Sequence, residues 1–342
     1  MRDSIFYSAM RALFVAFCVI IGIGLGILAW SILAGALSTT VDTRLKTVNT
    51  EEIMPNAEGV REVTRSAPAI LQINIDGIIG TEDLSANSVR QQLIESREGN
   101  FKLNTIKGIL LYINTPGGTV FDADGMYNAI KDYKKRYEVP VYAYIDGLCA
   151  SGGMYVAAAA DKIFASDVSL IGSVGVIAPT FVNVTKTLEK LGVETLTISA
   201  GKGKDALNPL RPWKPDEEKD YKNLIEYYYQ HFLNIVTTNR PKITREKLVE
   251  DYGAHLFPAP EAVEHGFIDE TVVSIADAIR ELTQKAGIEQ NYQVIRLTNR
   301  NWWSDMFSVQ SPLLTGKIKH QFDLTPRLEP ALQNQYLYMY QP

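Results

Sequence analysis

The chain has 342 residues, 46% of them hydrophobic and 21% charged, a composition that excludes an intrinsically disordered protein. The formal net charge of −5 argues against nucleic acid as a main partner, and we expect none. The cysteines, Cys18 and Cys149, provide no disulfide framework, and the histidines have no metal-ligand spacing. We therefore expect neither a metal nor a cofactor.

Residues 13–37, LFVAFCVIIGIGLGILAWSILAGAL, contain no charged side chain. A helix of this length spans roughly 37 Å, enough to cross a hydrocarbon core of about 30 Å with some tilt. The run is too long for a cleavable signal peptide, so it predicts one transmembrane helix in contact with membrane lipid. Because Arg2 and Arg11 precede it, we expect residues 1–12 in the cytoplasm. The rest of the chain is then predicted on the extracytoplasmic, or periplasmic, side of the inner membrane.

The remaining sequence separates into three parts. Residues 38–66 are polar and threonine-rich and predict a linker or a short helix. Residues 67–298 are expected to form the folded domain, with residues 299–342 as a C-terminal extension. In chain order, the patterns within the domain predict a strand at 69–80, a helix near 86–98, a strand and tight turn at 106–118, a helix at 121–136, a strand at 139–146, a helix at 151–160, a strand at 161–166, a turn and strand at 169–177, a helix at 181–191, a strand at 193–199, a long helix at 215–239, helices near 244–251, 258–265 and 274–285, and a strand at 292–297.

The predicted strands alternate with helices, and nearly all of them are apolar throughout. Strands buried on both faces have this character, which is typical of a mostly parallel sheet covered by helices. The fold class is therefore expected to be α/β.

Ser151 lies between small residues in GLCASGGMYVAAAA, residues 147–160. Serine is a favoured N-cap residue, so its hydroxyl could simply cap the helix that follows. A place after a strand and before a helix also suits a nucleophile, because the helix N-terminus adds positive potential there. The sequence around Ser151 alone leaves both readings open.

A candidate oxyanion hole is present in NTPGG, residues 114–118. Two glycines after a buried strand can present free N–H groups to a substrate, although they also suit a plain strand-to-helix turn. The spacing fits neither of the common glycine-rich phosphate-binding motifs.

The base that would activate Ser151 is not an obvious histidine. SDVSLIGSVGVIAP, residues 166–179, contains none, and the four histidines lie further along the chain, at His231, His255, His265 and His320. Lysine is the other amine that can serve when it is neutral. Lys202 and Lys204 follow a predicted strand in a glycine-rich stretch, where a solvated loop is the alternative interpretation.

Taken together, INTPGG, DGLCASGGMYVAAAADKI, IGSVGVI and GKGKD, in this order and spacing, resemble signal peptide peptidase A and its SohB relatives. The resemblance covers roughly residues 69–285 and includes EAVEHGFIDE at 261–270. It implies a ClpP/crotonase-like fold of repeated ββα units. It also implies roles for the site residues: Ser151 as nucleophile, Lys204 as general base with Lys202 as the weaker candidate, Gly118 and Gly117 as the oxyanion turn, and Ser173 as a hydroxyl that orients the lysine.

The function implied by this resemblance is a membrane-anchored serine endopeptidase with a Ser-Lys dyad that degrades remnant signal peptides and other membrane-associated peptides. The resemblance further implies a homo-oligomer, an octamer, in which neighbouring protomers share active sites. A crotonase-type acyl-CoA enzyme and a non-catalytic peptide-binding scaffold are the alternatives. Cys149 departs from the expected small residue beside the nucleophile, but we do not expect a cysteine nucleophile.

The last residues of the chain, QYLYMYQP, are expected either to lie in a neighbouring active site as a product-like strand or to form a packed or disordered tail. Trp302 and Trp303 are expected at a membrane interface or packed on the domain.

Overall fold

The computed structural model describes residues 11, 13–26, 50–61, 67–98, 105–289, 291–298 and 337–340. The chain divides into two units, Met1–Val48 and Asn49–Pro342. In the first unit, residues 13–26 are helical and their apolar side chains are exposed. Among the described residues, no helix has both the length and the apolar character needed to cross a membrane. Residues 27–37 of the expected span lie outside the described residues.

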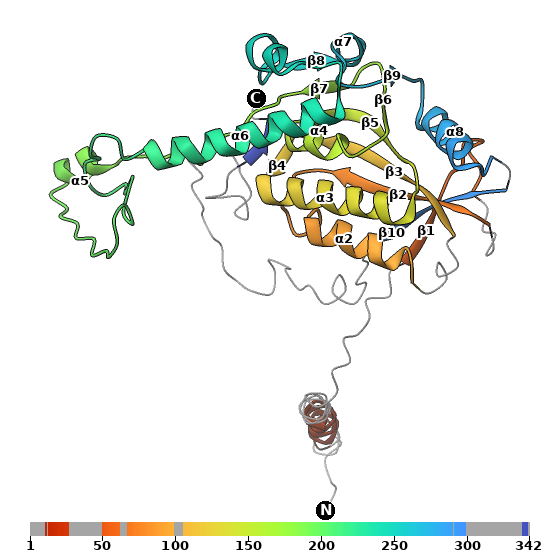
Figure 1. Ribbon diagram of the computed structural model, residues 1–342. Helices are drawn as coiled ribbons and strands as arrows, with labels where there is room; N and C mark the ends of the chain where they lie inside the picture. The colour runs from red at the N-terminus through yellow and green to blue at the C-terminus, as the bar shows by residue number, and fades with distance from the viewer. Residues whose placement is uncertain are drawn as a thin grey trace, which may run out of the picture. The chain divides into compact units, whose positions relative to one another are not determined.

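The second unit is built on a nine-stranded sheet, counted over the described residues (Figure 1). Its strands run in the order β1-β10-β2-β3-β5-β6-β9, and β7 pairs with both β5 and β8. The β1–β10 and β7–β8 pairs are antiparallel and the other pairs are parallel, which confirms the predicted mostly parallel sheet. The strands are β1 Thr50–Met54, β2 Ala69–Asp76, β3 Ile106–Thr115, β5 Val141–Ala150, β6 Lys162–Ala165, β7 Leu170–Gly172, β8 Leu256–Pro258, β9 Glu270–Thr271 and β10 Gln293–Thr298.

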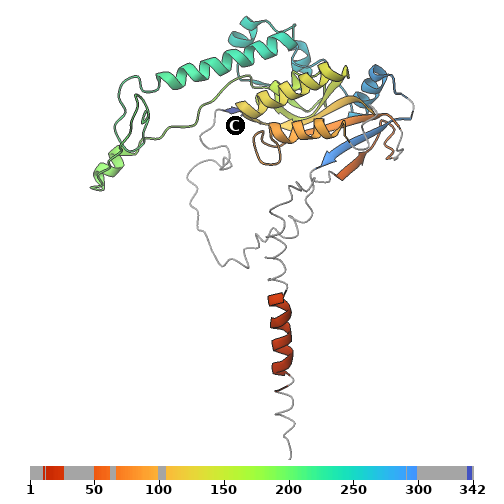
Figure 2. The ribbon, with the colours of Figure 1, turned by 60° about the horizontal axis from the view of Figure 1, so that its bottom comes forward.

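Helices cover both faces of this sheet (Figures 1 and 2). Because side chains alternate along a strand, Leu71 of β2 enters the larger core under α2, α3 and α4, whereas Ile70 faces the opposite side. That opposite side is covered by α8, which packs Ile279 and Leu282 onto it. The helices are α2 Ala86–Glu95, α3 Val120–Tyr137, α4 Gly152–Ala157, α5 Thr185–Lys190, α6 Lys219–Asn239, α7 Ala259–His265 and α8 Ile275–Ala286, with a π-helix at Lys247–Tyr252.

A separate two-stranded sheet lies at the carboxyl end of β3. It joins β4, Gly117–Thr119, to β11, Leu337–Met339, which is the described part of the C-terminal extension. Thr119 ends β4 and caps α3 by accepting a hydrogen bond from the Asp122 N–H at 3.1 Å. The glycine turn is thereby held between β3 and the start of α3.

The structure corrects several predicted elements. Residues 50–54, within the expected linker, form β1, because they find a partner in β10 at the far end of the domain. The segment 193–199, predicted as a strand, is exposed and pairs with no strand among the described residues. The long helix begins at Lys219 rather than at residue 215, since residues 215–218 form turns.

Candidate active site

Ser151 occupies a sharp turn between β5 and α4. Its backbone has φ 53° and ψ −112°, a conformation that a residue with a side chain rarely adopts. The Ser151 N–H donates to the Gly172 carbonyl oxygen at 2.9 Å, and the Ser151 carbonyl accepts from the Tyr155 N–H at 3.0 Å. The hydroxyl makes no capping bond to α4; its Oγ donates to the Gly175 carbonyl oxygen at 3.4 Å. Helix capping therefore does not explain this serine.

The glycine turn at β4 presents one amide to the side opposite Ile79. The Gly117 carbonyl accepts the Ile79 N–H at 2.9 Å, and the Thr119 N–H donates to the Ile79 carbonyl at 2.9 Å. In a planar trans peptide the N–H points away from the preceding carbonyl, so the Gly118 N–H points away from Ile79. A Cβ atom at Gly118 would lie only 1.8 Å from the Ile79 carbonyl oxygen, so no other residue fits there unshifted.

The C-terminal strand β11 occupies the groove on this free side of β4. Tyr338 lies opposite Gly118 in an antiparallel register, and the Tyr340 N–H donates to the Pro116 carbonyl at 2.7 Å. On its other edge, Leu337 exchanges two backbone hydrogen bonds of 3.1 Å with Ile177. An extended chain thus binds between two backbone edges, as a substrate strand does in β-augmentation. One alternative expected for the tail was a neighbouring active site; here its described residues pair instead with the chain's own β4. Trp302, Trp303 and His320 lie outside the described residues.

Ser173 lies on the turn that follows β7, next to Gly172, whose carbonyl accepts the Ser151 N–H. It has φ 55° and is almost completely buried, and its N–H donates to the His255 carbonyl at 2.7 Å. The preceding Gly172 has φ 130°, and a Cβ there would lie 2.5 Å from the same His255 carbonyl. The carbonyl of His255, the residue directly before β8, therefore helps to hold the turn at 172–173 close to Ser151.

Lys204 and Lys202 are not brought to Ser151 within the chain. Both are exposed, and they lie on turns between α5 and α6, in the part of the chain that extends away from the sheet (Figure 1). Ser151, in contrast, is only 1% exposed and belongs to the sheet core. A single chain thus provides the predicted nucleophile and oxyanion turn together, but not the predicted base.

The stretch that carries Lys204 is fastened by Arg211. The Arg211 guanidinium donates to the Asp205 carboxylate and carbonyl, both at 2.8 Å, and to the Glu217 carboxylate at 2.7 Å. Hydrogen bonds from Arg211 lower the pKa of Asp205 and the pKa of Glu217 below their ordinary values. Since Asp205 directly follows Lys204, this network fixes the backbone beside the predicted base.

The other nucleophile and base candidates have different partners. Burial raises the pKa of the Cys149 thiol, which is completely buried, so it stays protonated and unreactive. His231 lies 3.3 Å from the Asp124 carboxylate, His255 lies 2.8 Å from the Tyr252 carbonyl, and His265 lies 3.2 Å from the Glu261 carboxylate. None of these three histidines is hydrogen bonded to Ser151 in the described structure.

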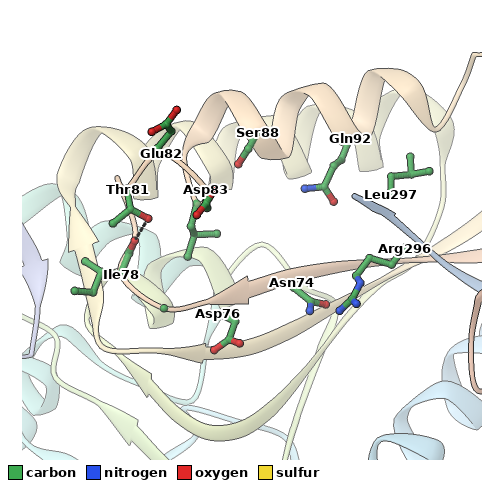
Figure 3. Close-up of a pocket in the computed structure, with 12 residues that line it drawn as sticks. Asn74, Asp76, Ile78, Thr81, Glu82, Asp83, Ser88, Gln92, Arg296 and Leu297 are labelled. Carbon is green, nitrogen blue, oxygen red and sulfur yellow. Dashed lines mark hydrogen bonds between the residues drawn. The ribbon is translucent and has the colours of Figure 1, made fainter. Parts of the chain in front are cut away.

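A cavity of about 610 Å³ lies beside the segment from β2 to α2 (Figure 3). Its lining includes the carboxylates of Asp76, Glu82 and Asp83, and Thr81 closes a turn there by donating to the Ile78 carbonyl at 3.0 Å. None of the described residues that line it is a predicted catalytic residue. Among the described residues, no group of three or more His, Cys, Asp or Glu could hold a metal ion.

The sequence analysis assigned no role to Thr115, the second residue of NTPGG. Its buried hydroxyl bonds to both neighbouring turns, at Gly77 and Gly117. The sequence signal was a hydroxyl residue directly before the Pro-Gly-Gly turn, which has no meaning until β2 is known to lie beside it.

Comparisons with known proteins agree with this geometry. Residues 133–289 match the model of peptidase family S49, and residues 72–169 match that of the Clp proteases. The chain is 27% identical over 283 residues to an Enterococcus faecium protein named as a signal peptide peptidase SppA, covering 78% of this chain and 79% of the relative. It is 32% identical to the chloroplastic serine protease SPPA of Arabidopsis thaliana and 27% identical to protease 4 of Haemophilus influenzae. These matches cover 60% and 72% of this chain, but 30% and 38% of those longer proteins.

A solved structure of a ClpP1 mutant from Listeria monocytogenes is 18% identical, with a TM-score of 0.41, covering 61% of this chain and 94% of that one. The family models and the protease relatives define the chain as a serine protease with a ClpP-like α/β fold. These matches support the family that its motifs indicated, that of signal peptide peptidase A.

Proposed function

We propose that this protease is an endopeptidase in which Ser151 attacks the peptide bond and Lys204 is the general base. The observation that carries the proposal is the position of Ser151. It lies at a strained turn, free of any capping bond, close to the backbone of the groove in which β11 pairs with Gly118. The GKGKD stretch supplies the amine that the described histidines do not.

The proposed reaction follows from these groups. Neutral Lys204 Nζ removes the Ser151 hydroxyl proton as Oγ attacks the carbonyl carbon. The Gly118 N–H donates to the resulting oxyanion, and Gly117 holds the turn. Lysine then returns the proton to the leaving amine, the C–N bond breaks, and water hydrolyses the acyl-enzyme ester with the same base. Ser173 is proposed to orient the lysine amine, as the family resemblance implies.

We propose that Lys204 comes from a neighbouring copy of the chain. Within the predicted strand at 193–199, Thr195 and Thr197 bond inward to Leu210 and Asn208, whereas Leu196 and Ile198 are 86% and 88% exposed. Such an apolar, unpaired stretch suits burial against a second copy. Burial there also favours the neutral amine that a lysine base requires. A heterologous contact of this kind forms a ring when the rotation between copies closes, and the family resemblance suggests an octamer.

The substrates are proposed to be signal peptides left in the membrane after processing, and other membrane-associated peptides. The names of the relatives and the groove's preference for an extended backbone support this substrate class. Residues 13–37 are proposed to anchor the protease in the inner membrane with residues 1–12 in the cytoplasm and the protease domain in the periplasm. Deleting residues 1–38 is expected to move the protein from the membrane fraction to the soluble fraction, and retention there would contradict the anchor.

The decisive experiment mixes two inactive variants. Ser151→Ala and Lys204→Ala proteins are each expected to cleave a fluorogenic peptide at background rate. Co-expression in equal amounts is expected to restore about a quarter of the wild-type rate, because that share of interfaces pairs an intact serine with an intact lysine. A mixture that stays inactive would contradict sharing between copies. Full activity of Lys204→Ala alone would show that another group is the base, and Lys202→Ala then tests the neighbouring amine.

A further inference from the structure

Thr115 is the last residue of β3 and is completely buried. Its hydroxyl donates to the Gly77 carbonyl at 2.5 Å and accepts the Gly117 N–H at 3.0 Å. The same oxygen lies 3.4 Å from the Gly117 carbonyl oxygen. One hydroxyl therefore joins the turn after β2 to the turn that begins β4.

These two turns together aim the Gly118 amide. The Gly117–Gly118 peptide is held from one side by Ile79, whose N–H bonds to the Gly117 carbonyl. Thr115 holds the preceding peptide through the Gly117 N–H. With φ 97°, Gly117 has much conformational freedom, so an unrestrained turn there would rotate the next amide away from the groove.

The methyl group of Thr115 lies against the helix that follows Ser151. A Cβ atom at Gly153 would come within 2.6 Å of Thr115 Cγ2, so this close approach exists only because residue 153 is glycine. Gly153 is the second residue of α4. Thr115 thus contacts the oxyanion turn through its hydroxyl and the nucleophile's helix through its methyl group.

We propose that Thr115 is a positioning residue that sets the Gly118 amide relative to Ser151 Oγ. The proposal rests on the proposed function, since it assumes that Ser151 attacks and that Gly118 stabilises the oxyanion. The hydroxyl and the methyl group of Thr115 have separate tasks in this proposal. The hydroxyl orients the donor, and the methyl group sets the spacing between the turn and α4.

The test separates these tasks with near-isosteric variants. Thr115→Val keeps the methyl contact but leaves the Gly117 N–H and the Gly77 carbonyl without their partner. We expect kcat to fall about 10- to 100-fold while KM stays within about threefold, because a displaced donor weakens the transition state more than the bound substrate. A peptide aldehyde, whose adduct carries the oxyanion, is expected to bind more weakly by a similar factor. Thr115→Ser keeps the hydroxyl and is expected to retain kcat within about threefold of wild type.

Thr283→Val is the matched control, because Thr283 is also buried and its hydroxyl donates to the Arg280 carbonyl within α8. This variant is expected to lose some thermal stability without a change in kcat. If Thr115→Val is unfolded by circular dichroism, Thr115→Ala and Thr115→Ser provide the same comparison, since they differ only in the hydroxyl.

A folded Thr115→Val protein with wild-type kcat and aldehyde affinity would overturn the positioning role while Ser151→Ala remains inactive. An active Ser151→Ala protein would instead overturn the proposed function itself. The role of the hydroxyl would also be rejected if Thr115→Ser lost as much kcat and thermal stability as Thr115→Val.

Discussion

Ser151 and Gly172 are joined by a hydrogen bond of 2.9 Å from the serine N–H to the glycine carbonyl, and both residues have positive φ. The bond ties the turn after β5 to the end of β7, the strand that pairs with β5 at this point. Because each turn restrains the other, the strained serine conformation persists in the folded protein. The orientation of Ser151 therefore depends on backbone contacts that no single motif contains.

The strain at Ser151 predicts an unusual order of stability among inactive variants. Glycine usually destabilises a folded position relative to alanine by about 0.5–1 kcal/mol. At φ 53° the alanine Cβ is strained, so we expect Ser151→Gly to be more stable than Ser151→Ala by about 1 kcal/mol, with both proteins inactive. Denaturant unfolding of the two variants measures the difference. An alanine variant that is clearly the more stable would argue against strain at this residue.

The pairing of β11 with β4 predicts that the C-terminal residues compete with substrate. Deleting residues 337–342 is expected to speed phosphonylation of Ser151 by a fluorophosphonate probe several-fold, because the groove beside Gly118 is then empty. A synthetic peptide with the sequence QYLYMYQP is expected to inhibit the shortened protein, and a scrambled peptide serves as its control. Equal phosphonylation rates for the full and shortened chains would show that β11 does not block the groove in solution.

The lowered pKa values of Asp205 and Glu217 predict a sensitivity to acid in the stretch that carries Lys204. Both carboxylates pair with Arg211, so their pKa values lie below the ordinary 3.8 and 4.5. At neutral pH both carboxylates are ionised and their ion pairs with Arg211 stabilise this stretch fully. This stabilisation is lost as the pH falls through the lowered pKa values, because protonation removes the ion pairs. Amide hydrogen exchange at residues 201–217 is expected to lose protection, relative to α3, as the pH falls below the ordinary carboxyl values of 3.8 and 4.5.

Arg211→Gln supplies the control for this acid effect. The variant is expected to show the same low protection already at neutral pH, together with reduced peptide cleavage. Unchanged protection in Arg211→Gln would mean that other contacts hold the stretch beside Lys204.

The raised pKa of the Cys149 thiol predicts that this cysteine takes no part in catalysis. In the folded protein the buried thiol stays protonated at pH 8, so iodoacetamide is expected to leave it unmodified. Cys149→Ala is expected to retain peptide cleavage within about threefold, since the substitution removes only one small buried group. Loss of acylation at Ser151 in a folded Cys149→Ala protein would contradict this prediction.

Much of the sheet was predictable from local pattern. The apolar runs of β2, β3 and β5 indicated buried parallel strands, and the glycine and serine motifs at their carboxyl ends indicated where chemistry would lie. In a parallel sheet these ends meet at one edge, so Gly118 and Ser151 could be expected to lie close together. Strands that depend on remote partners were not predictable: β1 is polar and needs β10, whereas the strand-like run at 193–199 has no partner in its own chain.

The sequence by itself therefore determined the α/β class, the serine and glycine motifs, and the absence of a histidine near Ser151 along the chain. Only the tertiary structure decided that the Ser151 hydroxyl makes no capping bond, that Thr115 holds the turn at Gly117, and that the C-terminal strand lies beside Gly118. It also decided that Lys204 lies apart from Ser151. The physical reason is that hydrophobic periodicity and turn propensity act over a few residues, whereas these relationships arise from backbone hydrogen bonds between segments far apart in the chain.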